Sequence, residues 1–208
     1  MYSEYINELI AVIAISAVMV VSPGQDFAMI TRNSLLYSRK AGILSAVGIF
    51  SAIWIHVGYS VAGIAIIISN SPLLYNTIKT AGAMYLLYLG IKNLFKKKIH
   101  QESKEVKNAS DISDFSAFHN GFISNALNPK TTLFFLSIFT QVVGPSTPID
   151  IQIVFGLIIA LAHLIWFIAV AYFFSSKIFV LKFNERKLLM ERLMGGALVL
   201  FALKIFFD

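Results

Sequence analysis

Six long apolar segments dominate this sequence and limit the folds that are open to it. A helix needs about 20 predominantly apolar residues to cross a hydrocarbon core about 30 Å thick. The segments are apolar on all sides rather than alternating with a period of two, which argues against transmembrane β-strands. We therefore expect an all-α polytopic membrane protein with six transmembrane helices, at residues 8–31, 42–68, 73–95, 117–143, 150–175 and 190–207.

The composition agrees with a membrane protein. Of 208 residues, 57% are hydrophobic and 13% are charged, whereas soluble domains have about 45–50% and about 25%. The first residues lack the basic region of a signal peptide and carry Glu4 and Glu8, so we expect the first apolar segment to be retained as a helix. The chain has no cysteine, which excludes disulfides and thiolate metal ligands. No cofactor is expected.

Basic residues concentrate in three of the connections between segments. Cytoplasmic loops of membrane proteins carry an excess of Lys and Arg. The three basic connections are therefore expected in the cytoplasm, with both termini outside, and the net charge of +6 needs no nucleic-acid partner. These residues are Arg32, Arg39 and Lys40 in loop 1–2; Lys96, Lys97, Lys98, Lys104 and Lys107 in loop 3–4; and Lys177, Lys182, Arg186 and Lys187 in loop 5–6.

A polar linker divides the chain into two halves of three segments each. It covers residues 96–116 and has mixed charge, which is typical of a solvated cytoplasmic linker. The halves are residues 1–95 and 117–208. An odd number of spans in each half means that the second half enters the membrane with the opposite orientation. Such inverted repeats are typical of secondary transporters.

The two halves share features in the same order. Pro23 and Pro129 are 106 positions apart, and His56 and His163 are 107 positions apart. These matches favour two inverted three-helix repeats whose first helices, the first and fourth spans, are both interrupted at proline.

The prolines predict where new half-helices start inside these two spans. Proline removes a helical hydrogen bond, and an unsatisfied polar group in hydrocarbon costs several kcal/mol. In the first span Ser22 suits the N-cap, Pro23 the first helical position, and Gln25 the spacing of a capping box. In the fourth span Asn128 suits the N-cap and Pro129 the first position.

Two ionisable residues, Asp26 and Lys130, follow these prolines. Half-helix N-termini bind anions, including substrate carboxylates. We expect Lys130 to meet a carboxylate, and Asp26 to meet a substrate ammonium or to carry a coupling proton. Alternatively, Asp26 complements a helix dipole, or the two residues pair with each other. The candidate substrate site comprises Ser22, Pro23, Gly24, Gln25, Asp26, Asn125, Asn128, Pro129 and Lys130.

His56 and His163 lie near the middle of the second and fifth spans. Histidine titrates in the physiological range, so both are candidates for proton coupling together with Asp26. A histidine inside a helical bundle also serves as an interhelical hydrogen-bonding group. No carboxylate lies near either histidine in the sequence, so no metal site is expected. Glycines in the spans, among them Gly48 and Gly58, are expected to let helices approach closely.

The motifs SPGQD, AGAMYLLYLGIKNL and GFISNALNPKTTLFF resemble those of the lysine-exporter (LysE/RhtB-type) family of small bacterial amino-acid exporters. The resemblance implies proton-driven export of amino acids or related small metabolites across the plasma membrane of a prokaryote. Pro23, Gly24 and Asp26 correspond to the family's Pro-Gly-Pro-Asn/Asp motif, in which Gln25 here replaces the second proline. The family's Asn-Pro-Lys motif corresponds to Asn128, Pro129 and Lys130.

These features together predict a transporter that works by alternating access around a central site between broken helices. Its expected partners are a small amino-acid-like solute, protons and the lipid bilayer. An ion or metal-cation transporter or channel of related architecture is the alternative. Asp26 is the one intramembrane carboxylate that the sequence suggests, and hard cations prefer several oxygen ligands. No HExxH, GxSxG or paired-carboxylate motif occurs, so no enzyme is expected.

Overall fold

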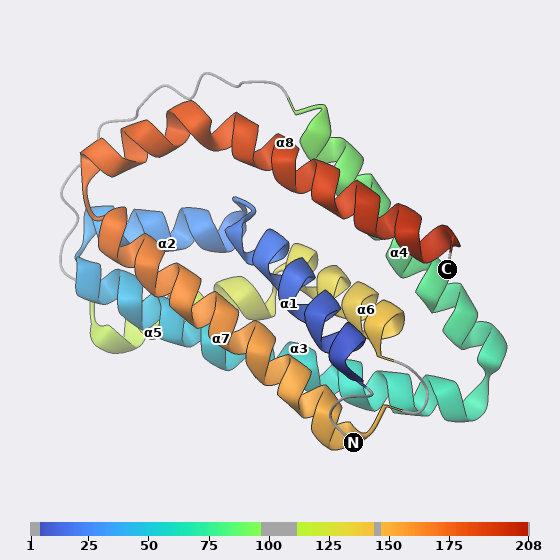
Figure 1. Ribbon diagram of the computed structural model, residues 1–208. Coiled ribbons are helices and arrows are strands. Elements are labelled where there is room, and N and C mark those ends of the chain that lie inside the picture. Colours follow the sequence, from blue (N-terminus) through green and yellow to red (C-terminus); the bar gives the residue numbers. More distant parts are fainter. Residues whose placement is uncertain (1–4, 97–111, 144–146, 208) are drawn as a thin grey trace.

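The computed structural model describes residues 5–96, 112–143 and 147–207, and these are helical apart from short connections. Within these ranges there are eight helices and no strand, which confirms the expected all-α class (Figure 1). The helices are α1 (Ile6–Val21), α2 (Gln25–Leu36), α3 (Arg39–Asn70), α4 (Pro72–Leu94), α5 (Asp114–Ala126), α6 (Pro129–Val142), α7 (Ile149–Phe173) and α8 (Lys177–Phe207).

Two helices in the described ranges are each long and apolar enough to cross a membrane. They are the 25-residue stretch Arg39–Gly63 of α3 and the 25 residues of α7. Helices α1 and α2 pass the same test as a pair, with a bend of 52° at the break between them. These two or three spans support a multi-pass membrane protein, and the six-span inverted repeat stays a prediction.

The first helix break differs from the expected cap. Ser22 ends α1, its N–H donating to the carbonyl of Met19 at 3.2 Å, and Gly24 is the N-cap residue of α2. Ser22 is therefore not the cap of the new helix, and Pro23 is not its first residue. The physical reason is that a residue before proline is pushed out of the α conformation, and Ser22 has ψ 115°. Gly24 adds a second extended residue, so α2 starts only at Gln25.

The second helix break has the expected cap. Asn128 is the N-cap residue of α6, its side-chain oxygen accepting a hydrogen bond from the N–H of Lys130 at 3.0 Å. Pro129 occupies the first helical position, where its missing N–H leaves no bond unmade. The prediction for the fourth span is confirmed at this residue level.

The last helix is longer than the sixth apolar segment. Helix α8 begins at Lys177, so the basic residues that the sequence suggested for loop 5–6 are helical. The stretch NERKLLMERL consists almost entirely of good helix formers, which explains why the helix continues beyond the apolar part.

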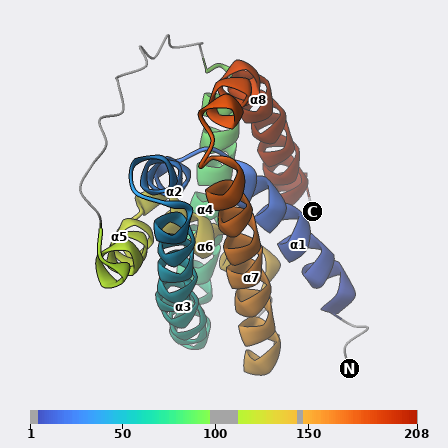
Figure 2. The ribbon, with the colours of Figure 1, turned by 90° about the vertical axis from the view of Figure 1, so that its left-hand side faces the viewer.

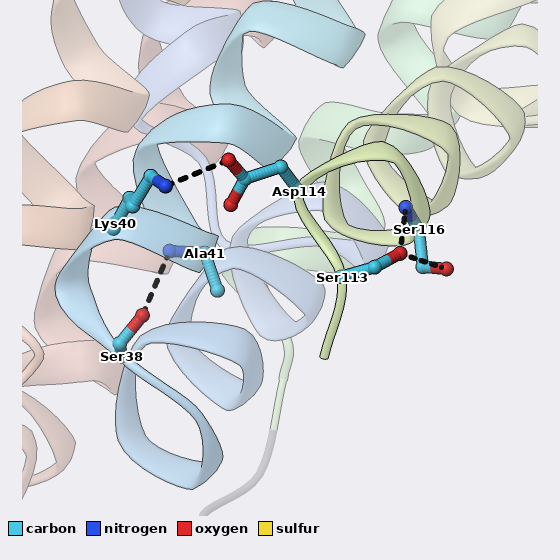
Figure 3. Close-up of polar contacts among 6 residues, drawn as sticks. All are labelled: Ser38, Lys40, Ala41, Ser113, Asp114 and Ser116. Carbon is cyan, nitrogen blue, oxygen red and sulfur yellow. Dashed lines mark hydrogen bonds and ion pairs between the residues drawn. The ribbon is translucent and has the colours of Figure 1, made fainter. Parts of the chain in front are cut away.

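Helices α3 and α5 begin beside each other (Figure 3). Ser38 and Ser113 lie just before the two helices, and each accepts a hydrogen bond at 3.1 Å from the backbone N–H three residues further on. Lys40 of α3 and Asp114 of α5 form an exposed ion pair at 2.6 Å. Because such a surface pair contributes at most about 1 kcal/mol, close packing along the two helices must hold them together.

Glycine lets the backbones of α3 and α5 touch. A Cβ atom on Gly48 of α3 would lie 2.1 Å from the carbonyl oxygen of Phe118, and one on Gly121 of α5 would lie 1.9 Å from that of Ser45. Helix α3 also packs on α7, and α4 packs on α8 (Figure 2). The expected role in close approach is wrong for Gly58 of α3, where a Cβ atom would meet nothing within 4 Å.

We predict that Gly48→Ala lowers the free energy of unfolding by about 1–3 kcal/mol, the range of overpacking substitutions, because its Cβ would overlap backbone atoms of α5. Gly58→Ala is the matched control on the same helix, where Ala should be neutral or slightly stabilising. Thermal unfolding of the detergent-solubilised protein measures both. Equal midpoints for the two variants would contradict the close α3–α5 contact.

Candidate functional site

The carboxylate of Asp26 joins the two helix breaks. Its Oδ1 accepts a hydrogen bond from Oγ of Ser124 at 3.1 Å, and its Oδ2 accepts from Nδ2 of Asn125 at 2.9 Å and of Asn128 at 3.0 Å. Asp26 is only 6% exposed and lies in the first turn of α2, where a negative charge is favoured by the helix dipole. Three donors at the break between α5 and α6 thus hold the start of α2.

Lys130 crosses the same junction in the other direction. Its Nζ donates to the backbone carbonyl of Ser22 at 3.2 Å, and a Cβ atom on Gly24 would lie 3.4 Å from it. In the described part of the chain Lys130 forms no ion pair with Asp26. The alternative in which these two residues pair directly is therefore absent from this structure, and the ammonium group keeps further donor capacity.

A small cavity of about 20 Å³ lies between the two breaks. This volume is enough for roughly one water molecule and too small for an amino acid. Of the expected site residues, Pro23, Asn125, Pro129 and His56 are not among the residues that line it. Its lining residues are Met19, Val20, Ser22, Gly24, Gln25, Asp26, Phe27, Asn128, Lys130, Thr131, His163 and Phe167.

The start of α2 faces this cavity without a side-chain cap. Gly24 has no side chain that could accept from the first turn, and no side-chain cap bond is present at this helix start. Gln25 is exposed, and its Nε2 donates to the carbonyl of Ser124 at 3.4 Å. The N–H groups of a helix start carry partial positive charge. Together with Lys130 they make this end of the cavity attractive to an anion.

The two histidines occupy different places. Nδ1 of His163 donates to the carbonyl of Ile159 at 2.8 Å, and its ring lines the cavity. His56 is not among the residues that line the cavity. Its Nε2 donates to the carbonyl of Asn125 at 3.1 Å, and its Nδ1 is 2.8 Å from the hydroxyl of Tyr59. His56 is also stacked on the ring of Phe135.

Several polar residues of this region were missed by the sequence argument. Ser124 and Thr131 flank the Asn-Pro-Lys motif, and their position next to it was a usable signal. Tyr59 lies three residues after His56, which places both side chains on one face of a helix. Glu191 is a second buried carboxylate, 3% exposed and 2.7 Å from Nζ of Lys96. Glu191 has its own counter-ion in Lys96, whereas Asp26 forms no ion pair in the described part of the chain.

Metal ligands do not gather at the site. Across residues 5–96, 112–143 and 147–207 no group of three or more His, Cys, Asp or Glu residues could hold a metal ion. The neighbours of Asp26 are amide and hydroxyl groups that point their hydrogen atoms at its carboxylate. In this arrangement they act as hydrogen-bond donors to Asp26 and not as further metal ligands beside it.

This chain is similar in sequence to a known family of membrane proteins. A family model described as LysE type translocator matches residues 17–208. The uncharacterized membrane protein YrhP of Bacillus subtilis is 30% identical over 205 residues, covering 95% of this chain and 98% of that protein. The leucine efflux protein of Salmonella typhimurium is 34% identical over 131 residues, covering 62% of this chain and 60% of that protein. No solved structure matches.

We predict that Asp26 and Asn128 are energetically coupled, because their side chains share a buried hydrogen bond. Asn128→Ala should lower the free energy of unfolding by about 1–3 kcal/mol. The loss should be smaller by at least about 0.5 kcal/mol when Asp26→Ala is already present. The capping bond of Asn128 to α6 is lost in both backgrounds and cancels in this cycle.

Thermal or denaturant unfolding in detergent measures the cycle. Asn76, exposed on α4, offers a control: Asn76→Ala and Asp26→Ala should be additive. Additivity of Asp26→Ala with Asn128→Ala as well would show that the contact between the two helix breaks contributes nothing to stability.

Proposed function

Because this chain belongs to the family of LysE type translocators, we propose that it exports amino acids or related small metabolites across the plasma membrane of a bacterium. It is a transporter and not an enzyme. The proton motive force drives this export, by alternating access around the site between the two helix breaks. The relative that is a leucine efflux protein makes leucine the first solute to test.

The observation that carries this proposal is the cavity at which both helix breaks meet. Lys130 and the uncapped start of α2 together suit a carboxylate. The four lone-pair sites of the Asp26 carboxylate receive three hydrogen bonds, so Oδ1 can accept one more, from a substrate ammonium. A zwitterion would thus bind with its carboxylate toward Lys130 and its ammonium toward Asp26.

The size of the cavity supports a cycle in which the helices move. At about 20 Å³ the site is closed around a space for roughly one water molecule, so an amino acid enters only when the two breaks separate. The paired packing of α3 with α7 and of α4 with α8 supports two inverted repeats that rock against each other. Pro23 and Pro129 would then mark equivalent hinges.

The contacts between helix ends support a membrane topology with both termini outside. The start of α3 and the end of α7 lie beside each other, toward the left in Figure 1. There, Cζ of Arg39 lies 4.1 Å from the ring centroid of Tyr172, and Nε of Arg39 lies 3.4 Å from Oγ of Ser175. Lys40 beside it pairs with Asp114 at the start of α5. The starts of α3 and α5 and the end of α7 thus meet at one end, which we assign to the cytoplasm. Residues 97–111, with most of the basic residues of loop 3–4, lie outside the described residues.

We predict that the reconstituted protein exchanges labelled leucine, or another member of a panel of labelled amino acids, across the membrane of proteoliposomes. An inward proton gradient should accelerate net export. Lys130→Met should reduce exchange by about tenfold or more, because a hydrogen bond to a charged group contributes about 1.5–3 kcal/mol and about 1.4 kcal/mol is tenfold.

Lys182→Met is the control, because Lys182 is exposed on α8 away from the cavity. It should retain wild-type exchange. If no amino acid moves, the proposed function is wrong. If Lys130→Met exchanges amino acids at the wild-type rate, the proposed function is retained but the proposed carboxylate site is wrong.

We also predict the sidedness of two exposed positions, which single cysteines can report because the chain has no cysteine of its own. In intact cells a membrane-impermeant maleimide should label Asp150→Cys, at the start of α7, and spare Lys182→Cys, on α8. Permeabilised cells should show labelling of both. The opposite pattern would reverse the proposed topology.

A further inference from the structure

A fully buried histidine, His56, has both ring nitrogens engaged. Its exposed fraction is 0%. Nε2 lies 3.1 Å from the carbonyl oxygen of Asn125, and Nδ1 lies 2.8 Å from the hydroxyl oxygen of Tyr59. Because a carbonyl oxygen only accepts, Nε2 carries a hydrogen in this arrangement. Whether Nδ1 also carries one depends on the hydroxyl of Tyr59.

The hydroxyl of Tyr59 has two acceptors within reach and one hydrogen to donate. One acceptor is Nδ1 of His56, and the other is the backbone carbonyl of Thr132 on α6, at 3.3 Å. When His56 is neutral, Tyr59 donates to Nδ1. When His56 is protonated, Nδ1–H donates to the Tyr59 oxygen and the hydroxyl hydrogen turns to Thr132. Both states of the imidazole are then fully hydrogen-bonded.

We infer that His56 carries the proton that is coupled to export, and that Tyr59 is the positioning residue that lets it do so. The inference rests on the proposed function and deepens it. In the step, one proton binds Nδ1, the Tyr59 hydroxyl rotates from Nδ1 to Thr132, and no bond of Nε2 changes. The proton enters from the outside and leaves to the cytoplasm, when the reverse rotation returns the hydroxyl to Nδ1.

A single residue, Asn125, connects His56 to Asp26 at the cavity by hydrogen bonds. The carbonyl of Asn125 accepts from His56, and its side-chain amide donates to Oδ2 of Asp26. Three ionisable groups lie around His56: Tyr59 on its own helix, Asp26 on α2 and His163 on α7. The positive charge of Lys130 on α6 interacts with His163. Asp26 is negative when ionised, and would attract an imidazolium.

The other two proton-coupling candidates lack such a reversible partner. A protonated carboxyl of Asp26 could offer its hydrogen to neither of the amide groups that donate to Oδ2. From Oδ1 it could donate to the hydroxyl of Ser124, but among the hydrogen bonds of the described residues that hydroxyl has no second acceptor, whereas the hydroxyl of Tyr59 has one in Thr132. Nδ1 of His163 donates to Ile159 in its own helix, and within the described residues no hydrogen bond to its Nε2 is present. Of the three candidates, only His56 has a partner hydroxyl with an acceptor in both protonation states.

The first test examines the unaltered protein. The full chain is labelled with ¹⁵N-histidine, and its imidazole nitrogens are observed by NMR as the pH is lowered, with His56→Gln used to assign the His56 signals. At high pH we expect the neutral form with hydrogen on Nε2 and with Nδ1 as acceptor. At low pH both nitrogens should be protonated. A neutral form with its hydrogen on Nδ1, or a ring that never protonates, would overturn the inference.

The second test measures coupling in proteoliposomes. Labelled leucine, followed if necessary by the amino-acid panel, is exchanged at equal pH, and proton entry is then recorded with a pH-sensitive dye during net export. Tyr59→Phe keeps the ring but cannot satisfy Nδ1. One hydrogen bond to a charged group corresponds to a factor of about ten or more in the proton affinity of Nδ1, so the number of protons moved per substrate should fall below the wild-type ratio.

Controls separate this role from a structural one. His56→Gln should lose coupling completely, because the proton-binding imidazole is gone, and adding Tyr59→Phe to it should change nothing further. Tyr88→Phe, at an exposed position of α4, should keep the wild-type ratio. Wild-type proton coupling in Tyr59→Phe would overturn the inference while leaving export intact. If the unaltered protein exchanges no amino acid, the proposed function is wrong. The NMR result would then test separately whether His56 binds and releases a proton at Nδ1.

Discussion

The buried carboxylate of Asp26 is the contact on which the arrangement of this site depends. It receives hydrogen bonds from Ser124, Asn125 and Asn128, so the start of α2 is held to the break between α5 and α6. Replacing the carboxyl group by an apolar side chain would leave these donors without an acceptor, and a buried unsatisfied donor costs about 1–3 kcal/mol. The cavity therefore exists only where both interrupted helices meet.

The two breaks satisfy their freed backbone groups in different ways. At the second break the side chain of Asn128 caps α6. At the first break Gly24 provides no cap, and the start of α2 faces the cavity with Lys130 nearby. In hydrocarbon an uncapped helix start is tolerated where it lines a cavity or meets a ligand. The uncapped break is thus the one that we propose for a substrate anion.

Charge near this site is balanced by neighbours on other helices rather than along one helix. Glu191 of α8 is paired with Lys96 at the end of α4, and Asp26 of α2 is bonded to groups of α5 and of the α5–α6 break. His56 of α3 reaches the same break through Asn125. Movement of one set of helices against the other would therefore change several of these contacts together.

The sequence by itself determined the helical class, the two interruptions and the Asn128 cap, because apolar run length, proline and a capping residue act locally. It did not predict that Ser22 ends α1 or that α8 begins at Lys177. Tertiary structure alone decided that Asp26 bonds to Asn125 and not to Lys130, and that the hydroxyl of Tyr59, next to His56, reaches the carbonyl of Thr132. These contacts join residues about 70–100 positions apart in the sequence. Only the packed bundle brings their atoms within hydrogen-bonding distance.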